Sequence, residues 1–225
     1  MNPRATHDWQ PAPHAPRLRA GEVHLWRAPL GDATPELRDT LSPAECVRAE
    51  RFHFERDRRR FIAARGLLRT ILGRYLDLDP REVRFVFGEH GKPALDGACS
   101  TLRFNLSHSD DLLLLAVSHA REVGVDVEFM RADVPFGALA DRYFEPEDAW
   151  RLRLLPPAER AWHFYELWTS TEARLKAGGR GLGGGTHIVA PDRWSLLRLT
   201  PAAGYAAALA VEGGAFQLNC WSWNP

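Results

Sequence analysis

Lysine is nearly absent from this sequence of 225 residues, because only Lys92 and Lys176 occur among the 29 basic residues and arginine supplies the others. The 29 acidic residues balance this charge, and the formal net charge at pH 7 is zero. Proteins whose whole surface coats nucleic acid or an anionic membrane carry a positive excess. The balance argues against both classes, and each retained lysine raises the question of why it was kept.

Cysteine is scarce, and long apolar runs are absent. Cys46, Cys99 and Cys220 lie far apart and form no C-x-x-C pair, which argues against a disulfide framework or a zinc site and fits a reducing compartment. The apolar run at residues 112–117 is too short to span a bilayer, and residues 1–10 contain no signal-peptide stretch. We therefore expect a cytoplasmic protein with no membrane partner.

The overall composition is that of a globular protein, with 45% hydrophobic and 26% charged residues. A chain of this length can bury about 70% of its unfolded surface, which is enough for one large core or two modest ones. Residues 1–17 contain four prolines among polar residues and predict a loose, disordered tail.

Helical and strand periodicities follow one another in no repeating order, which predicts an α+β fold. Four helices are expected. One starts at residue 43, behind a serine N-cap, and another starts at residue 146. The other two cover residues 56–75 and 157–177. The expected strands are 22–27, 84–87, 101–106, 112–118 and 123–129. Residues 178–185 predict a glycine-rich loop, and the apolar runs 205–211 and 215–223 predict a hairpin.

The first of these helical regions is strongly basic. Residues 44–74 contain nine arginines and four acidic residues. An excess of this kind suits an anionic partner, which could be a nucleic acid or a phosphorylated cofactor.

Paired carboxylates follow the strand pattern at residues 123–129. Apolar residues occupy every second position, so Asp126 and Glu128 share the opposite face. Neighbouring carboxylates repel each other unless a hard cation such as Mg²⁺ binds them. The alternative is the solvated face of an edge strand, which is the commoner explanation of such a pair on its own.

A third carboxylate lies on the helix expected at residues 157–177. Trp168, Glu172 and Lys176 are spaced by four residues and therefore share one helix face. An exposed Glu–Lys pair is the simple alternative. The retained lysine favours a functional site, because an exposed pair would accept arginine equally well.

Two turns carry further polar groups. Ser107, His108 and Ser109 follow an expected strand end and could donate hydrogen bonds to an anion, or could only form a turn. A hydrolase triad is not supported, because no nucleophile elbow is present and adjacent strand residues point to opposite faces. Lys92 lies in a Gly-Lys-Pro turn, for which a simple turn is again the alternative.

Together these segments resemble the 4′-phosphopantetheinyl transferase family, of the stand-alone type that activates the carrier proteins of peptide and polyketide synthetases. The matching segments are residues 91–93, 104–109, 124–128 and 168–176, followed by 179–182. The resemblance implies two similar α+β halves related by a pseudo-twofold axis, with the active site in the cleft between them. The halves would be residues 18–121, on the side of the coenzyme A adenosine and 3′-phosphate, and residues 122–225, with the metal site.

The family transfers the phosphopantetheine arm of coenzyme A to a serine of an apo acyl or peptidyl carrier protein and releases adenosine 3′,5′-bisphosphate. By resemblance, Asp126, Glu128 and Glu172 would hold Mg²⁺, with Mn²⁺ as an alternative that shares its ligands. Asp126, Glu172 and Lys176 would be catalytic. Glu172 would take the proton of the attacking serine, and Lys176 would offset the charge on the leaving phosphate.

The resemblance also assigns residues to coenzyme A. Ser107 and His108 would bind phosphate oxygens or nearby hydroxyl groups, in addition to Lys176. The contacts with the adenosine and its 3′-phosphate would come from Lys92 and Arg48, with one or more of Arg51, Arg59 and Arg60.

One position departs from the family pattern. Many members have lysine directly before the metal-binding glutamate, where this chain has Thr171, so Arg174 or Arg180 could take over a phosphate contact. We expect an active monomeric enzyme that binds no nucleic acid. The alternatives are a non-catalytic protein that binds coenzyme A or a carrier, and an arginine-rich module that binds nucleic acid.

Overall fold

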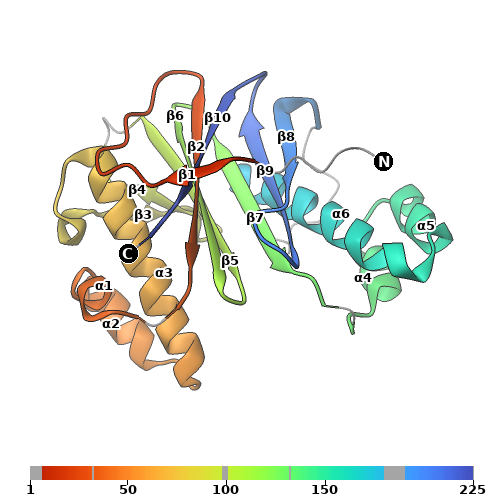
Figure 1. Ribbon diagram of the computed structural model, residues 1–225, viewed down its shortest axis with the longest axis horizontal. Coiled ribbons are helices and arrows are strands. Elements are labelled where there is room, and N and C mark those ends of the chain that lie inside the picture. Colours follow the sequence, from red (N-terminus) through yellow and green to blue (C-terminus); the bar gives the residue numbers. More distant parts are fainter. Residues whose placement is uncertain (1–6, 32, 98–100, 132, 180–190, 225) are drawn as a thin grey trace.

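The computed structural model describes residues 7–31, 33–97, 101–131, 133–179 and 191–224. Its elements form four layers (Figure 1): the long helix α3 (Glu55–Leu76), a five-stranded sheet, a three-stranded sheet and the second long helix, α6 (Pro157–Ala177). Helices and strands are mixed, as predicted for an α+β fold. None of the helices in the described ranges is both long and apolar enough to cross a bilayer.

The five-stranded sheet has the order β1-β10-β2-β6-β5. β10 runs parallel to its neighbours β1 and β2, whereas β2, β6 and β5 pair antiparallel. The bounds of its strands are β1 (Trp9–Pro11), β2 (Glu22–Pro29), β5 (Leu102–Ser109), β6 (Leu112–His119) and β10 (Gln217–Ser222).

The three-stranded sheet is antiparallel, with the order β7-β9-β8. It consists of β7 (Val123–Phe129), β8 (Trp194–Leu199) and β9 (Tyr205–Glu212), while β3 (Phe85–Phe87) and β4 (Pro93–Leu95) form a separate pair. The shorter helices are α1 (Pro35–Asp39), α2 (Pro43–Glu50), α4 (Phe136–Tyr143), α5 (Pro146–Leu154), η1 (Pro80–Glu82) and η4 (Pro191–Arg193).

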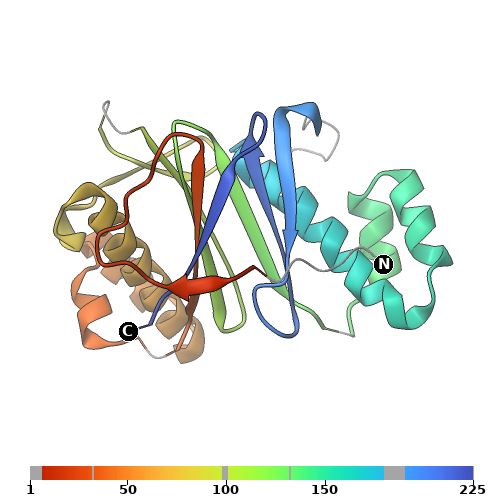
Figure 2. The ribbon, with the colours of Figure 1, turned by 45° about the horizontal axis from the view of Figure 1, so that its top comes forward.

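The core lies between and outside the two sheets. Alternating apolar residues of β2 and β6 meet those of β7 and β9, and this cluster joins the sheets face to face. The opposite face of the five-stranded sheet packs against α3, and that of the three-stranded sheet packs against α6. Figure 2 shows the same arrangement from a second direction, with α4 and α5 beside the start of α6.

The two halves repeat one arrangement. Strand β2 is followed by α3 and belongs to the order β2-β6-β5, and strand β7 is followed by α6 and belongs to the order β7-β9-β8. β10 departs from this division, because it follows the second half in sequence and lies in the sheet of the first half. The last strand therefore ties the two halves together.

The predicted hairpin at the C-terminal end is wrong, because β9 and β10 belong to different sheets. Arg121 donates hydrogen bonds to the carbonyl oxygens of Glu212, Gly214 and Ala215 and so holds the connecting turn. Apolar residues of the second run pack in the core between the sheets instead, where Cys220 is buried.

Residues 7–17 do not form the expected loose tail. Trp9–Pro11 pairs with β10, and the backbone N–H of Ala12 donates to the carbonyl oxygen of Ser222 at 3.0 Å. The exposed edge of β10 offers unpaired backbone groups, and an extended segment with proline can cover such an edge. Residues 1–6 of that tail, and residues 180–185 of the expected glycine-rich loop, lie outside the described residues.

A buried ion-pair network joins α2 to α3. Ser42 and Glu45 form the predicted capping box at the start of α2. The Glu45 side chain also accepts hydrogen bonds from Arg65 and Arg69 at 2.7 Å. Glu45 is only 8% exposed, so removal of its charge leaves two arginines uncompensated.

The substitution Glu45→Gln should therefore lower the free energy of unfolding by about 3 kcal/mol at pH 7. Burial raises the pKa of Glu45, but hydrogen bonds from Ser42 and Arg69 outweigh it and hold that pKa below its usual range. A lowered folded-state pKa stabilises the fold above the unfolded-state pKa of about 4.3 and ceases to do so as the pH falls through the folded-state value. Urea unfolding of both proteins from pH 7 to pH 3 measures this difference. A difference that stays constant to pH 3 would contradict the assignment.

Candidate active site

The two halves meet at a polar seam between β5 and β7. These strands belong to different sheets, and three side chains of β5 bridge them. The backbone N–H groups of Val125, Val127 and Phe129 donate to side-chain oxygens at 2.8, 3.4 and 3.1 Å. The acceptors are Asn105, Ser107 and Ser109, which the strand period of two places on one face. The seam therefore fixes β7 and its acidic side chains against the first half.

Asp126 lies at the centre of the seam and is 2% exposed. Its Oδ1 accepts hydrogen bonds from Lys176 Nζ at 2.6 Å and from Ser107 Oγ at 3.0 Å. Its Oδ2 is buried without a hydrogen-bond partner. Burial raises the pKa of Asp126, and the Lys176 ammonium acts against that rise. A buried carboxylate oxygen without a partner is costly and calls for a cation or a donor.

Glu128 and Glu172 add two carboxylates beside Asp126. Glu128 Oε2 accepts a hydrogen bond from Ser109 Oγ at 2.7 Å, and Glu172 Oε1 is buried without a partner. Burial raises the pKa of both glutamates, and the charge of Asp126 raises each further. The three carboxylates therefore destabilise one another when all are ionised.

The carboxylate oxygens of these acids are the type of ligand that a hard divalent cation binds. Two buried carboxylate oxygens, on Asp126 and Glu172, lack partners, and oxygen donors are the ligands that such cations prefer. Within the described ranges, no group of three His, Cys, Asp or Glu side chains is arranged so that it could hold a metal ion. Lys176 supplies the positive charge beside Asp126 in this structure.

Helix α6 presents the predicted face to β7. Lys176 bonds to Asp126, Glu172 lies within electrostatic range of both acids of β7, and Trp168 donates a hydrogen bond to Glu128. The alternative of an exposed Glu–Lys pair is therefore wrong, as is that of a solvated edge-strand face for Asp126.

Ser107 and His108 lie on opposite faces of β5. The strand continues to Ser109, whereas we expected a turn after residue 106. Ser107 faces Asp126 and Lys176, whereas His108 points to the opposite face and is exposed. Desolvation by its neighbours, followed by the charges of Lys176 and Arg60, lowers the pKa of His108. Ser109 shares the face of Ser107, as does Asn105, which we did not expect among the site residues.

The four candidate arginines lie on or beside α2 and α3. Arg60 donates to Asp110 and Asp111 at 2.7 Å each, and Arg59 lies 3.7 Å from Glu55. The Arg48 guanidinium lies 5.2 Å from the centre of the Phe61 ring, and Arg51 is an exposed residue at the end of α2. Their contacts with coenzyme A stay predictions.

Arg174 and Arg180 are the two residues expected to take over the phosphate contact of a lysine at position 171. Arg174 is half-buried with an unpartnered Nε, and burial, followed by the nearby charge of Arg198, lowers its pKa. Arg180 lies outside the described residues.

Lys92 lies in the turn that connects β3 to β4, and its side chain bonds to residues of the second half. Its Nζ donates to Glu122 Oε2 at 2.8 Å, to the carbonyl oxygen of Ala177 at 3.0 Å and to that of Val123 at 3.3 Å. These bonds hold the start of β7 and the end of α6, the two elements that carry the acidic residues. The contact of Lys92 with coenzyme A stays a prediction, and its position at this junction was not foreseen.

The substitution Lys92→Met should lower the free energy of unfolding by about 2 kcal/mol, because hydrogen bonds to a charged group contribute about 1.5–3 kcal/mol. Arg81→Met provides the control, since the Arg81 side chain is 69% exposed in its pair with Asp79 and such pairs contribute little. Thermal or urea unfolding measures both variants. Equal, small effects of the two substitutions would contradict a structural role for Lys92.

Comparisons with known proteins agree with this geometry. Residues 26–120 match the family model described as 4′-phosphopantetheinyl transferase, N-terminal, and residues 122–219 match that of the 4′-phosphopantetheinyl transferase superfamily. The chain is 42% identical to the 4′-phosphopantetheinyl transferase HetI of Nostoc sp. over 96% of this chain and 99% of that protein.

Two further relatives have lower sequence identity to this chain. The phosphopantetheinyl transferase of Thraustochytrium sp. is 35% identical over 77% of this chain and 64% of that protein. The 4′-phosphopantetheinyl transferase Sfp of Bacillus subtilis is 29% identical over 63% of this chain and 62% of that protein. With both halves matched and a relative of 42% identity aligned over nearly the full length, the chain belongs to the 4′-phosphopantetheinyl transferase superfamily.

Proposed function

We propose that this chain transfers the 4′-phosphopantetheine arm of coenzyme A to a serine of an apo acyl or peptidyl carrier protein and releases adenosine 3′,5′-bisphosphate. The observation that carries the proposal is the polar seam, where buried carboxylate oxygens without partners lie beside a lysine. The relatives are named for this transfer. We assign residues 18–121 to the side of the adenosine and residues 122–225 to the metal site, and we place the reaction in the cytoplasm of the cell, carried out by a monomer.

Asp126, Glu128 and Glu172 would hold a divalent cation, Mg²⁺ or alternatively Mn²⁺. Their oxygens are hard donors, and those of Asp126 and Glu172 lack a partner. When bound, the cation would neutralise charge on the pyrophosphate of coenzyme A. The residues around the acids fix their orientation, because Ser107 bonds to Asp126 and Ser109 bonds to Glu128.

Glu172 would accept the proton of the attacking serine hydroxyl. Burial, followed by the charge of Asp126, raises the pKa of Glu172, which favours proton uptake from a weak acid. The serine oxygen forms a bond to the phosphorus that carries the pantetheine arm, and the bond from this phosphorus to the leaving adenosine bisphosphate breaks. Lys176 would offset the negative charge on the leaving phosphate.

The first half would bind the rest of coenzyme A. Ser107 and His108 would contact phosphate oxygens or hydroxyl groups near the seam. The adenosine and the 3′-phosphate would meet the basic residues Lys92, Arg48, Arg51, Arg59 and Arg60. Arg60 would first need to exchange its bonds with Asp110 and Asp111.

A module that binds nucleic acid is not favoured, because the three carboxylates of the seam would repel a phosphate backbone. A non-catalytic protein that binds coenzyme A or a carrier differs from an enzyme only in turnover. The position of Thr171 is the residue difference that could produce it.

Incubation with coenzyme A, Mg²⁺ and an apo carrier protein, followed by intact-mass measurement of the carrier, tests the proposal. We expect a gain of one phosphopantetheine with the wild-type chain and with Glu159→Gln, an exposed residue of α6. We expect no gain with Asp126→Ala. The absence of any gain with acyl and peptidyl carriers alike would refute the transfer.

A further inference from the structure

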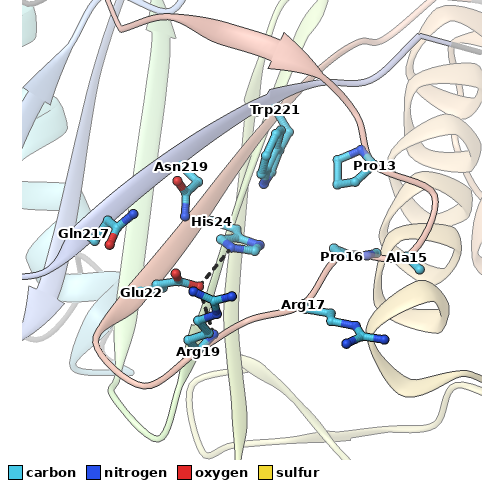
Figure 3. Close-up of a pocket in the computed structure, with 10 residues that line it drawn as sticks. All are labelled: Pro13, Ala15, Pro16, Arg17, Arg19, Glu22, His24, Gln217, Asn219 and Trp221. Atoms are coloured by element: carbon cyan, nitrogen blue, oxygen red, sulfur yellow. Dashed lines mark hydrogen bonds and ion pairs between the residues drawn. The ribbon is translucent and has the colours of Figure 1, made fainter.

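A cavity beside β2 is lined by residues that take no part in the polar seam. It has a volume of about 290 Å³ and lies between β2, β10 and the segment before β2. Figure 3 shows Trp221, His24 and Glu22 along one wall, across from Pro13 and Pro16. The volume is at the lower end of the range for small-molecule sites, which limits an occupant to a small ligand.

This cavity occupies the place in the first half that the seam occupies in the second. β2 corresponds to β7, and α3 corresponds to α6. Lys176, the next-to-last residue of α6, bonds to Asp126 on β7, and Tyr75, the next-to-last residue of α3, bonds to His24 on β2 at 2.7 Å. The repeated fold therefore places a polar pair between the end of the long helix and the first strand in each half, with different chemistry. The neighbouring strands differ, because β10 pairs with β2 in one sheet, whereas β5 meets β7 from another sheet.

The hydrogen bonds among Trp26, Tyr75 and His24 determine the tautomer of His24. Trp26 Nε1 can only donate, and it donates to the Tyr75 hydroxyl at 2.8 Å. The hydroxyl proton of Tyr75 is therefore free to be donated to His24 Nδ1, which leaves the imidazole proton on Nε2. Burial lowers the pKa of His24, which favours the neutral ring. His24 Nε2–H is then a donor on the wall of the cavity, where it faces the Glu22 carboxylate.

The other polar groups of the cavity are mostly donors as well. Trp221 Nε1 is buried and has no hydrogen-bond partner. Arg17 and Arg19 line the opening, and within the described ranges neither guanidinium forms an ion pair. Glu22 is the one acidic residue among those that line the cavity. Its Oε2 accepts a hydrogen bond from the backbone N–H of Arg19 and lies 3.7 Å from His24 Nε2. The lining thus has a positive excess and an unused indole donor.

We propose that this cavity binds a small organic anion, which has a flat apolar body against Trp221, Pro13 and Pro16 and a carboxylate or phosphate group held by Arg19, His24 and the Trp221 indole. Guanidinium groups and N–H donors suit either oxyanion. The apolar wall suits a planar body, because aromatic surfaces are buried well against tryptophan and proline. This site is separate from the transfer site and does not depend on the proposed transfer.

Titration of ¹⁵N-labelled full-length protein with benzoate, phenyl phosphate and benzamide tests the proposal. The indole N–H signal of Trp221, identified by its loss in Trp221→Phe, reports binding at this cavity. We expect a saturable shift with at least one of the two anions and at least tenfold weaker binding of the neutral benzamide. A shift with one anion alone identifies the charged group of the ligand. A shift with one anion and a shift with both anions each support the site. The absence of a shift with both anions, or equal binding of benzamide, would overturn it.

The double variant Arg17→Gln/Arg19→Gln removes the positive charge at the opening. We expect it to bind the anion at least tenfold more weakly, whereas the exposed control Arg81→Gln should bind like the wild type. Unchanged affinity of the double variant would overturn the anion site. Phosphopantetheine transfer by the double variant should equal that of the wild type, and a fall would overturn the separation of the two sites.

Discussion

The substitution Gly124→Ala should lower the free energy of unfolding by at least about 3 kcal/mol and abolish transfer. Gly124 lies on β7 where α6 crosses it. A Cβ at this position would lie 2.9 Å from Ala177 Cα, and closer still to the carbonyl oxygen of Ala173 and the backbone nitrogen of Ala177. Because these are backbone atoms, no side chain can rotate away, and α6 has to move off β7. This movement would separate Glu172 and Lys176 from Asp126.

Gly214→Ala is the matched control. A Cβ at Gly214 meets no atom within 4 Å, so this variant should unfold within about 0.5 kcal/mol of the wild type. Urea unfolding of the three proteins measures the stabilities, and intact-mass measurement of the carrier measures transfer. A Gly124→Ala variant as stable and as active as Gly214→Ala would show that α6 and β7 do not pack at the distance described.

The substitution Glu172→Gln should reduce the rate of transfer by about 10²–10⁴-fold, which is the usual contribution of a general base, without a loss of stability. Glutamine keeps the size of the side chain but cannot accept the serine proton. Burial and the charge of Asp126 raise the pKa of Glu172, so its ionised form costs stability above its folded-state pKa. The neutral amide avoids that cost, and the melting temperature at pH 7 should stay unchanged or rise.

Glu159→Gln is the control for this experiment, because it makes the same chemical change on the exposed start of α6. Single-turnover measurements with saturating coenzyme A and carrier protein separate the chemical step from binding. A Glu172→Gln variant that transfers within a factor of three of Glu159→Gln would remove Glu172 from the role of base. A large loss of stability in Glu172→Gln would instead assign it a structural role.

Much of the framework was predictable from local patterns. The alternation of Val123, Val125 and Val127 correctly placed Asp126 and Glu128 on a common face, and the steps of four in α6 placed Glu172 and Lys176 on the helix face that meets them. The capping box at Ser42 correctly predicted the start of α2. Such features depend on neighbours in the sequence, and the same periodicity governs them in any fold.

Features that depend on distant partners were not predictable. Local alternation could not reveal that residues 217–222 pair with β2, because two strands of one hairpin and two strands of different sheets have the same pattern. The polar residues of β5 looked like a turn, since Ser107 and Ser109 find their partners on β7 and have none within their own segment. Extending the strand alternation beyond residue 106 would have placed Ser107 and Ser109 on one face with Asn105.

The two lysines illustrate the same division. Their rarity marked both as positions of interest, and the structure places both against β7 and α6, the elements that carry the three acidic residues. Lys176 contacts Asp126 directly, whereas Lys92 binds Glu122 and the carbonyl oxygen at the end of α6. Composition could not distinguish a residue that touches the site from one that supports the elements around it.

The central claim is that Asp126, Glu128 and Glu172 form a metal-dependent transfer site at the seam of the two halves. The most direct test is the rate of phosphopantetheine transfer after treatment with a chelator, measured before and after the addition of Mg²⁺, in the wild type and in Asp126→Asn. We predict that the chelated wild type is inactive and regains its activity with Mg²⁺, and that Asp126→Asn stays inactive at every Mg²⁺ concentration. Full transfer by the chelated wild type, or wild-type activity of Asp126→Asn, would contradict the claim.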